Sequence, residues 1–168
     1  RESRTGCPAF LSKFIVIAVI QRVSRAGITI DGKQGGEMGR GFVILLGVMK
    51  GDTLLEVNTL AEKLAGLRVF TDEQDKMNLS LNDVGGDILL VSNFTLGADC
   101  RKGRRPSFDK SMPPAEAEPL YEAFVEKMRM LCGGTVYTGK FGADMEVSLV
   151  NDGPVTILLD TDDLVKHA

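Results

Sequence analysis

The residues best placed to do chemistry follow directly after the apolar run 88–91, and they are Ser92, Asn93, Phe94 and Thr95. A buried strand fixes its own backbone, so polar groups at its end meet a ligand in a defined geometry. As a nucleophile, Thr95 would need an activating base, and the sequence offers no obvious one. We therefore interpret Thr95 as a hydrogen-bonding wall of a pocket and Ser92 as a positioning hydroxyl.

The composition argues against several other kinds of site. The one histidine, His167, is the penultimate residue, so a Ser-His-Asp triad or a Cys-His pair would need a tail residue to reach the core. The three cysteines are odd in number and show no C-x-x-C spacing. This pattern favours a reducing compartment, by default the cytoplasm, over a disulfide scaffold or a zinc site. We expect no metal and no cofactor.

A second chemically distinctive stretch is NDGPVT at 151–156, which joins the strand-like runs 145–150 and 155–159. Gly153 can take backbone angles closed to other residues, whereas Pro154 fixes its own φ and donates no hydrogen bond. On local sequence alone a hairpin turn is favoured, because Asn-Asp-Gly is typical of one. The alternative is a stiff corner, with a cis Gly153-Pro154 bond, that projects into a ligand site.

The dense basic segment DCRKGRRPSF at 99–108, called the basic loop below, contains Arg101, Lys102, Arg104 and Arg105. A charge run on a loop with Gly and Pro is usually a solvated surface. The same cations also suit a phosphate backbone, to which Arg binds especially well. The net charge of −3 argues against a generic nucleic-acid binder but leaves a local patch open.

The length of the chain and the order of its expected helices and strands predict one α+β domain that positions these residues. A chain of 168 residues, 43% of them hydrophobic, is long enough for one well-buried core and short for two. Helices are expected from Asp52 or Thr53 to about 67, and from Pro113-Pro114 to about 132. Strands are expected at 15–23, 27–30, 42–48, 69–70, 88–96, 135–138, 145–150 and 155–159. This order favours a curved, mainly antiparallel or mixed, barrel-like sheet with two main helices.

The two ends of the chain look unlike the rest. The basic start followed by the apolar run 14–20 faintly imitates a signal peptide, but no small-residue cleavage site follows. The run is also too short to span a bilayer, so we expect no membrane association. Residues 1–14 are interpreted as an N-terminal extension, 15–162 as the domain and 163–168 as a C-terminal tail.

Several separated motifs together resemble the D-aminoacyl-tRNA deacylase family, of the D-Tyr-tRNA deacylase type. In chain order they are AVIQRVSRA at 18–26, LLGV at 45–48, KMNLS at 76–80, SNFTL at 92–96, ADCRKGRRPSF at 98–108, FGADM at 141–145 and VSLVNDGPVT at 147–156. The resemblance covers roughly residues 16 to 160. One departure matters, because the family usually has Ser-Gln-x-Thr-Leu and this chain has Asn93 in place of Gln. The shorter amide can weaken the contact that the Gln makes.

The resemblance implies a homodimer in which the Gly-cisPro corner of one subunit enters the active site of the other. The substrate would be aminoacyl-tRNA, cleaved at the ester between a D-amino acid and the terminal adenosine. Gly153 and Pro154 would form a chiral gate whose carbonyls fill the space that an L side chain needs. Glycine has no side chain to reject, so glycyl-tRNA, including glycine mischarged on tRNA-Ala, should also be cleaved.

The same resemblance assigns roles at the site. An aminoacyl ester is already activated, so hydrolysis needs a positioned water and a stabilised oxyanion more than a strong base. The backbone N–H groups of Phe94 and Thr95 are candidate oxyanion donors, each worth ~10²–10³ in rate, and the RNA 2′-hydroxyl would assist. Further contacts would come from Phe141 and Met145 at the terminal adenine, from Asn151 in the substrate site, and from Arg101, Lys102, Arg104 and Arg105 on tRNA. For Phe141 a place in the core is an equally open reading, and for Met145 the core is the favoured one.

Two other classes remain open. An RNA-binding module without turnover would use the basic loop and need neither SNFTL nor the Gly-Pro corner. An esterase with Thr95 or Ser92 as covalent nucleophile would need a carboxylate such as Asp99 or Asp144, and it would form an acyl-enzyme. No DNA partner is expected.

Overall fold

A computed structural model describes the backbone of residues 15–165. The predicted N-terminal extension, 1–14, and His167 lie outside the described residues. The predicted boundary before the C-terminal tail falls inside α3 (Thr161–Val165), a short helix whose Leu164 packs against the hydrophobic core.

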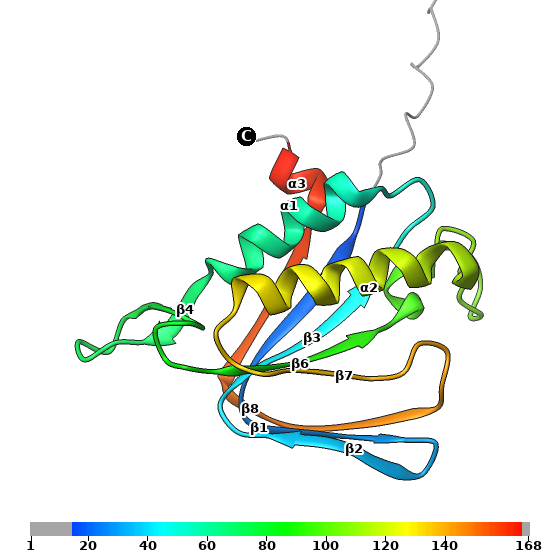
Figure 1. Cartoon of the computed structure of the whole chain (residues 1–168). Helices are drawn as coiled ribbons and strands as arrows, with labels where there is room; N and C mark the ends of the chain where they lie inside the picture. The colour runs from blue at the N-terminus through cyan, green and yellow to red at the C-terminus, as the bar shows by residue number, and fades with distance from the viewer. Residues whose placement is uncertain (1–14, 166–168) are drawn as a thin grey trace, which may run out of the picture.

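A six-stranded mixed sheet curves into a nearly closed barrel, as Figure 1 shows. Its strands are β1 (Ile17–Ile30), β2 (Lys33–Met38), β3 (Gly41–Gly47), β6 (Asp87–Ser92), β7 (Val136–Thr138) and β8 (Met145–Asp160). The order is β2-β1-β3-β6-β7, with β8 also paired to β1. The β3–β6 and β6–β7 pairs are parallel and the others antiparallel. The predicted α+β class with a barrel-like sheet is confirmed.

The helices α1 (Leu54–Ala65) and α2 (Pro114–Leu131) lie side by side on one face of the sheet (Figure 1). Successive side chains of a strand point to opposite faces. Along β3, Phe42 and Ile44 belong to the cluster that faces the helices, whereas Val43 belongs to a second cluster with Leu89 and Val91. One sheet therefore supports two cores, and the helices cover only one of them.

Thr53 is the residue that caps α1. Its hydroxyl accepts a hydrogen bond from the Leu55 N–H, and the Glu56 carboxylate accepts one from the Thr53 N–H. This capping box satisfies two N–H groups that the first helical turn leaves free. The other candidate, Asp52, lies just before the helix and bonds instead to the Met49 N–H.

The two strands predicted at 15–23 and 27–30 are in fact one, because β1 runs unbroken through both. Its pairing with β8 shifts register between Gln21 and Val23 and again between Val23 and Arg25. These bulges bend the strand without ending it. The sequence analysis also missed β2, whose KQGGEM sequence has no apolar alternation; it forms because the edge of β1 supplies its hydrogen-bond partners.

The strand predicted over 88–96 ends early. β6 stops at Ser92, and Phe94–Gly97 form a short 3-10 helix, η1. Asn93 terminates the strand because its side-chain oxygen accepts a hydrogen bond from the Thr95 N–H and so caps η1. Ser92 and Asn93 therefore lie at the turn between β6 and η1. The start of η1 fixes the orientation of the backbone N–H groups there.

The hairpin favoured by local sequence at 151–156 is wrong. A hairpin would pair the two flanking runs with each other, but both pair with β1, with Val150 opposite Arg25 and Thr156 opposite Gln21. Residues 151–155, called the Gly-Pro corner below, therefore bulge out of one long strand. The Gly153-Pro154 peptide bond is cis, and Gly153 has a φ of 142° that side chains rarely permit.

Beside the barrel, β4 (Arg68–Thr71) and β5 (Met77–Ser80) form a separate two-stranded hairpin, which projects at the left of Figure 1. The predicted strand at 69–70 is confirmed. This hairpin lies close to the Gly-Pro corner, because both contact the side chain of Arg22.

Candidate active site

A cavity of about 710 Å³ lies where the ends of β3 and β6 meet η1, α2 and the loop before β8. Its volume falls in the range of about 300–1,000 Å³ that is common for small-molecule sites. Among its lining residues are Ser92, Asn93, Phe94, Phe108, Ser111, Tyr121, Phe141 and Met145. The structure thus brings together two predicted groups of site residues that are almost fifty positions apart in the chain.

The short helix η1 is fixed against the cavity by hydrogen bonds at its start. The Asn93 N–H donates to the Leu46 carbonyl at 2.8 Å, and the Ser111 hydroxyl donates to the Phe94 carbonyl at 2.7 Å. Packing fixes its far end. A Cβ on Gly97 would lie 2.5 Å from the Ser111 Oγ and 2.6 Å from the Met49 Sδ. The backbone that carries the candidate oxyanion donors therefore has little freedom to shift.

One of those donors is already engaged. The Asn93 Oδ1 accepts a hydrogen bond from the Thr95 N–H at 3.3 Å and a second, short one from the Thr95 hydroxyl. The bond to the N–H is long and therefore weak. An oxyanion can compete for this N–H if the Asn93 amide turns away. Thr95 itself is exposed and is absent from the cavity lining, so it reaches the site through Asn93.

The opposite part of the cavity is aromatic. Phe141 contacts Tyr121, with ring centroids 5.9 Å apart, and the Tyr121 hydroxyl donates to the Leu90 carbonyl at 3.0 Å. Burial raises the pKa of Tyr121 to about 12, so this phenol stays protonated at neutral pH. A Cβ on Gly139 would lie 2.4 Å from the Met145 Sδ, so glycine makes room for Met145 at the lining. The expected adenine contacts of Phe141 and Met145 stay predictions.

The Gly-Pro corner is braced from inside by Asn151. Its Oδ1 accepts a hydrogen bond from the Val155 N–H at 2.7 Å, and its Nδ2 donates to the Thr156 hydroxyl at 3.0 Å and to the Gln21 Oε1 at 3.2 Å. Asn151 therefore links both sides of the corner to β1. Its predicted role in substrate binding is untested, and its side chain lies outside the cavity of its own chain.

Arg22 also holds the corner, and the sequence analysis assigned it no role. It is only 9% exposed; its Nε donates to the Asp152 carbonyl at 2.9 Å and its Nη1 to the Val69 carbonyl at 2.8 Å. The guanidinium thus ties the corner to β4. The sequence shows no alternation here, because the run 14–20 is apolar without a break; in the structure Ala18, Ile20 and Arg22 occupy alternate buried positions of β1, where an arginine needs partners.

The Gly-Pro corner and the cavity do not meet within one chain. Gly153 and Pro154 are exposed, and neither lines the cavity. The structure therefore brings Ser92, Asn93 and Phe94 together with the aromatic part of the site and leaves the Gly-Pro corner apart from them.

The cations of the basic loop are not equivalent. The Arg101 Nε donates to the Asp99 Oδ1 at 2.9 Å, and these bonds hold the pKa of Asp99 well below its usual range. The Lys110 Nζ lies 3.8 Å from the same carboxylate. Within residues 15–165, Lys102 and the two arginines Arg104 and Arg105 have no ion pair. All three are exposed.

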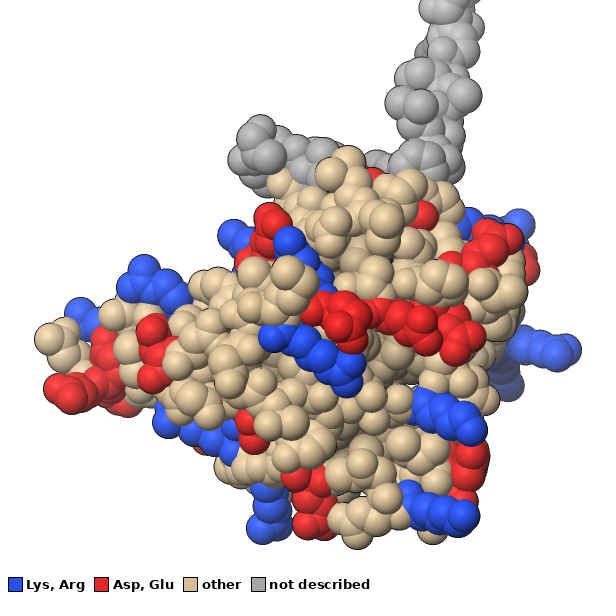
Figure 2. Space-filling view, viewed as in Figure 1, with Lys and Arg blue, Asp and Glu red and all other residues tan. Residues whose placement is uncertain are grey.

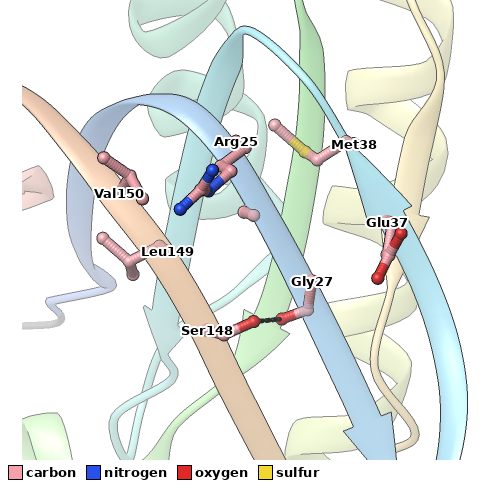
Figure 3. A pocket seen from close by; sticks show the side chains of 8 residues that line it. Arg25, Gly27, Glu37, Met38, Ser148, Leu149 and Val150 are labelled. Atoms are coloured by element: carbon pink, nitrogen blue, oxygen red, sulfur yellow. Dashed lines mark hydrogen bonds between the residues drawn. The ribbon is translucent and has the colours of Figure 1, made fainter.

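A second cavity, of about 410 Å³, opens between β1, β2 and β8. Figure 3 shows Arg25 from β1, Glu37 from β2 and Ser148 from β8 around it, with the Ser148 hydroxyl donating to the Gly27 carbonyl at 3.4 Å. Arg25 is exposed and has no hydrogen bond or ion pair with another described residue. No predicted catalytic residue lies here, which makes Arg25 a useful control position.

Asp52 gives a pH-dependent prediction. It is 6% exposed, and burial raises its pKa to about 7 from 3.8. Between these values the unfolded chain has lost the proton that the folded chain keeps, so the free energy of unfolding falls as pH rises, by at most roughly 4 kcal/mol. Asp52→Asn keeps an acceptor for the Met49 N–H but cannot ionise, so its melting temperature should stay level from pH 5 to 8 while that of the wild type falls. An equal fall in both proteins would contradict this assignment.

Comparisons with known proteins agree with the geometry. The family model described as D-Tyr-tRNA(Tyr) deacylase matches residues 19–160. D-aminoacyl-tRNA deacylase of Symbiobacterium thermophilum is 55% identical over 148 residues, which cover 88% of this chain and 97% of that one. The enzyme of the same name from Geotalea uraniireducens is 58% identical over 144 residues, covering 86% and 92%.

Solved structures share the fold. A structure named c-Myc DNA Unwinding Element Binding Protein superposes with a TM-score of 0.80 at 43% identity, covering 85% of this chain and 97% of that one. A probable eukaryotic D-amino acid tRNA deacylase has a TM-score of 0.75 at 19% identity, covering 87% and 99%, and supports the fold alone. No helix in the described part of the chain is long and apolar enough to cross a membrane. The chain belongs to the D-Tyr-tRNA(Tyr) deacylase family, which confirms the resemblance and the prediction of a hydrolase.

Proposed function

We propose that this chain hydrolyses the ester bond of D-aminoacyl-tRNA and releases the free D-amino acid and the tRNA. Membership of the family supports the activity. The observation that carries the assignment to this site is the fixed start of η1, which faces a cavity that also contains Phe141 and Met145. The proposal puts the Phe94 N–H and a base site at Phe141 and Met145 in one cavity, as the ester of a terminal adenosine requires, while Thr95 offers its N–H from just outside the lining.

The chemistry needs no strong base from the protein. A water oxygen attacks the ester carbonyl carbon, and the N–H groups of Phe94 and Thr95 stabilise the oxyanion. The bond to the ribose oxygen then breaks, and the proton lost by water passes to that oxygen through the neighbouring RNA 2′-hydroxyl. Two observations agree with a route that uses no protein base. Tyr121 is protonated at neutral pH, and the Asp99 carboxylate is paired with Arg101 and Lys110. The 2′-hydroxyl route would confine activity to RNA esters.

The chiral gate is proposed to act between two copies of the chain. Gly153 and Pro154 are exposed and braced by Asn151 and the buried Arg22, yet they lie outside the cavity of their own chain. A second copy can insert the Gly-Pro corner beside η1. Among the described residues β8 pairs only with β1, so its outer edge is free to join such an interface. Carbonyls at the corner then exclude an L side chain, while D-aminoacyl and glycyl esters fit.

Replacing Thr95 separates this route from covalent catalysis. Thr95→Ala removes the hydroxyl that contacts Asn93 and keeps the backbone N–H. One hydrogen bond is worth about 0.5–1.5 kcal/mol, so kcat/KM for D-tyrosyl-tRNA should fall by no more than about tenfold. Intact-mass spectrometry during turnover should find no acyl-enzyme. Complete loss of activity together with a trapped acyl-enzyme in the wild type would instead support Thr95 as a nucleophile.

The function is tested with D-tyrosyl-, L-tyrosyl- and glycyl-tRNA as separate substrates and no added metal. Rapid release from the D-tyrosyl and glycyl esters with the L ester spared is the expected result. Equal cleavage of the D and L esters would refute the gate. Binding of tRNA without cleavage of any ester would support the RNA-binding module. A cytoplasmic location stays a prediction from the cysteine pattern.

A further inference from the structure

Two large aromatic rings stand exposed at the cavity. Phe94 is 59% exposed and Phe108 is 37% exposed, and both line the cavity. They meet edge to face with ring centroids 5.1 Å apart. Exposed apolar groups beside a concave site often mark the contact surface of a ligand. The mechanism above uses only the backbone of Phe94 and does not use Phe108 at all.

The pair is held in place by its neighbours. The Ser107 N–H and carbonyl exchange hydrogen bonds with Asp99 at 2.9 and 2.7 Å, which closes the basic loop. The Phe108 carbonyl accepts a hydrogen bond from the Ser111 N–H at 3.0 Å, while the Ser111 hydroxyl donates to the Phe94 carbonyl. Ser111 therefore connects the backbones of both phenylalanines, and the rings form a preformed platform.

The cavity thus has two aromatic pairs of different character. Tyr121 is buried, and with the half-buried Phe141 it forms an enclosed pair. Phe94 and Phe108 form an open pair. In the proposed function the terminal adenine contacts Phe141, one ring of the enclosed pair, together with Met145, and the polynucleotide must leave the cavity towards solvent. An open aromatic surface on that exit is suited to the next base of a single strand, because every base has a face that stacks.

The charge around the open pair fits a polynucleotide. Phe108 belongs to the basic loop, whose Lys102, Arg104 and Arg105 are exposed and form no ion pair with a described residue. Figure 2 shows Lys and Arg side chains projecting at the right-hand side, where Figure 1 places the loop between η1 and α2. A base needs an aromatic face and its phosphate needs cations, and one segment supplies both. An amino-acid side chain would use the rings but not the charges.

We propose that Phe94 and Phe108 form a stacking subsite for the base of the nucleotide that precedes the terminal adenosine, with its phosphate facing the basic loop. This inference rests on the proposed function and adds the part of the RNA that the enzyme reads beyond the ester. Stacking contributes affinity without selecting the identity of the base. The subsite should therefore act on any RNA that ends in a single strand.

The test compares Phe108→Ala with the wild type on two substrates, D-tyrosyl-tRNA and D-tyrosyl-adenosine, which lacks the preceding nucleotide. Loss of one stacking ring should lower kcat/KM for the tRNA by about tenfold and leave the adenosine ester within about twofold. Phe108→Tyr keeps an aromatic face and should restore the tRNA value. Met130→Ala, on an 81% exposed residue of α2 outside the cavity, serves as the control and should change neither.

Other outcomes overturn the inference. Equal losses on both substrates would place Phe108 at the adenosine or the amino acid, and no loss on either would leave the ring without a role. Dissociation of Phe108→Ala in sedimentation, with the wild type intact, would assign the rings to a subunit interface. Failure of the wild type to cleave either substrate would refute the proposed function alone. Binding of a fluorescent CCA trinucleotide to both proteins would then decide the subsite, with about tenfold weaker binding by Phe108→Ala supporting it and equal binding refuting it.

Discussion

Arg22→Ala is expected to let the enzyme cleave L-tyrosyl-tRNA. The Arg22 guanidinium donates to the Asp152 carbonyl and to the Val69 carbonyl, and it is nearly buried. Hydrogen bonds from a charged group contribute about 1.5–3 kcal/mol each, so their loss frees the Gly-Pro corner to yield to an L side chain. We expect the ratio of L to D cleavage, measured as kcat/KM, to rise by at least about tenfold, with the D rate changed less.

Two further variants keep this result interpretable. Arg22→Lys retains the charge with fewer donors, so it should show a smaller rise in L cleavage and should fold even if the alanine variant is unstable. Arg25→Ala removes an exposed arginine of the same strand that lines the second cavity (Figure 3) and has no hydrogen bond or ion pair with another described residue, and its D and L rates should match those of the wild type. If Arg22→Lys folds and still spares the L ester as strictly as the wild type, Arg22 has no role in excluding L-aminoacyl esters.

Gly97→Ala should lower kcat for D-tyrosyl-tRNA by about 100-fold, the scale of one lost oxyanion donor. The added Cβ would lie 2.5 Å from the Ser111 Oγ and 2.6 Å from the Met49 Sδ, so η1 must shift. That shift moves the N–H groups of Phe94 and Thr95 away from the ester. The Phe141 end of the cavity is untouched, so KM should change much less than kcat.

Steric rescue distinguishes displacement of η1 from general damage. Adding Met49→Ala to Gly97→Ala removes the thioether that the new Cβ would meet and keeps the hydrogen bond from the Ser111 hydroxyl to the Phe94 carbonyl, so part of the lost kcat should return. Gly39→Ala is the matched control, because a Cβ there meets nothing within 4 Å, and it should be neutral. A double variant no faster than Gly97→Ala alone, although folded, would argue that the position of η1 does not limit the rate.

Much of the cavity was predictable because its chemistry lies in short segments. The polar residues after an apolar strand marked Ser92 and Asn93, and the family motifs added Phe141 and Met145. Local sequence failed where long-range pairing decides the structure. Asn-Asp-Gly is typical of a hairpin, but both flanks of the Gly-Pro corner pair with β1, whose hydrogen-bond partners lie about 130 positions away.

The residues that support the site were harder to predict. The Ser111 hydroxyl matters because it meets the Phe94 carbonyl, and no pattern around Ser111 announces that contact. No pattern in the sequence marked Gly97, since its tight contacts depend on the packing of Ser111 and Met49. Arg22 follows an unbroken apolar run, so its burial at an alternate position of β1 and its bonds to Asp152 and Val69 became visible only in the structure.

The most direct measurement asks whether gate and cavity come from different copies. One subunit carries Arg22→Ala and a first affinity tag, the other carries Gly97→Ala and a second tag, and the mixed dimer is purified through both. In the mixed dimer only the Arg22→Ala subunit has a working cavity, and only the Gly97→Ala subunit has an intact Gly-Pro corner. If the corner of one subunit acts on the cavity of its partner, the working cavity receives the intact corner, so the mixed dimer should hydrolyse D-tyrosyl-tRNA and spare L-tyrosyl-tRNA. Cleavage of the L ester at the rate of the Arg22→Ala homodimer would show that each gate serves its own cavity and would contradict the shared site.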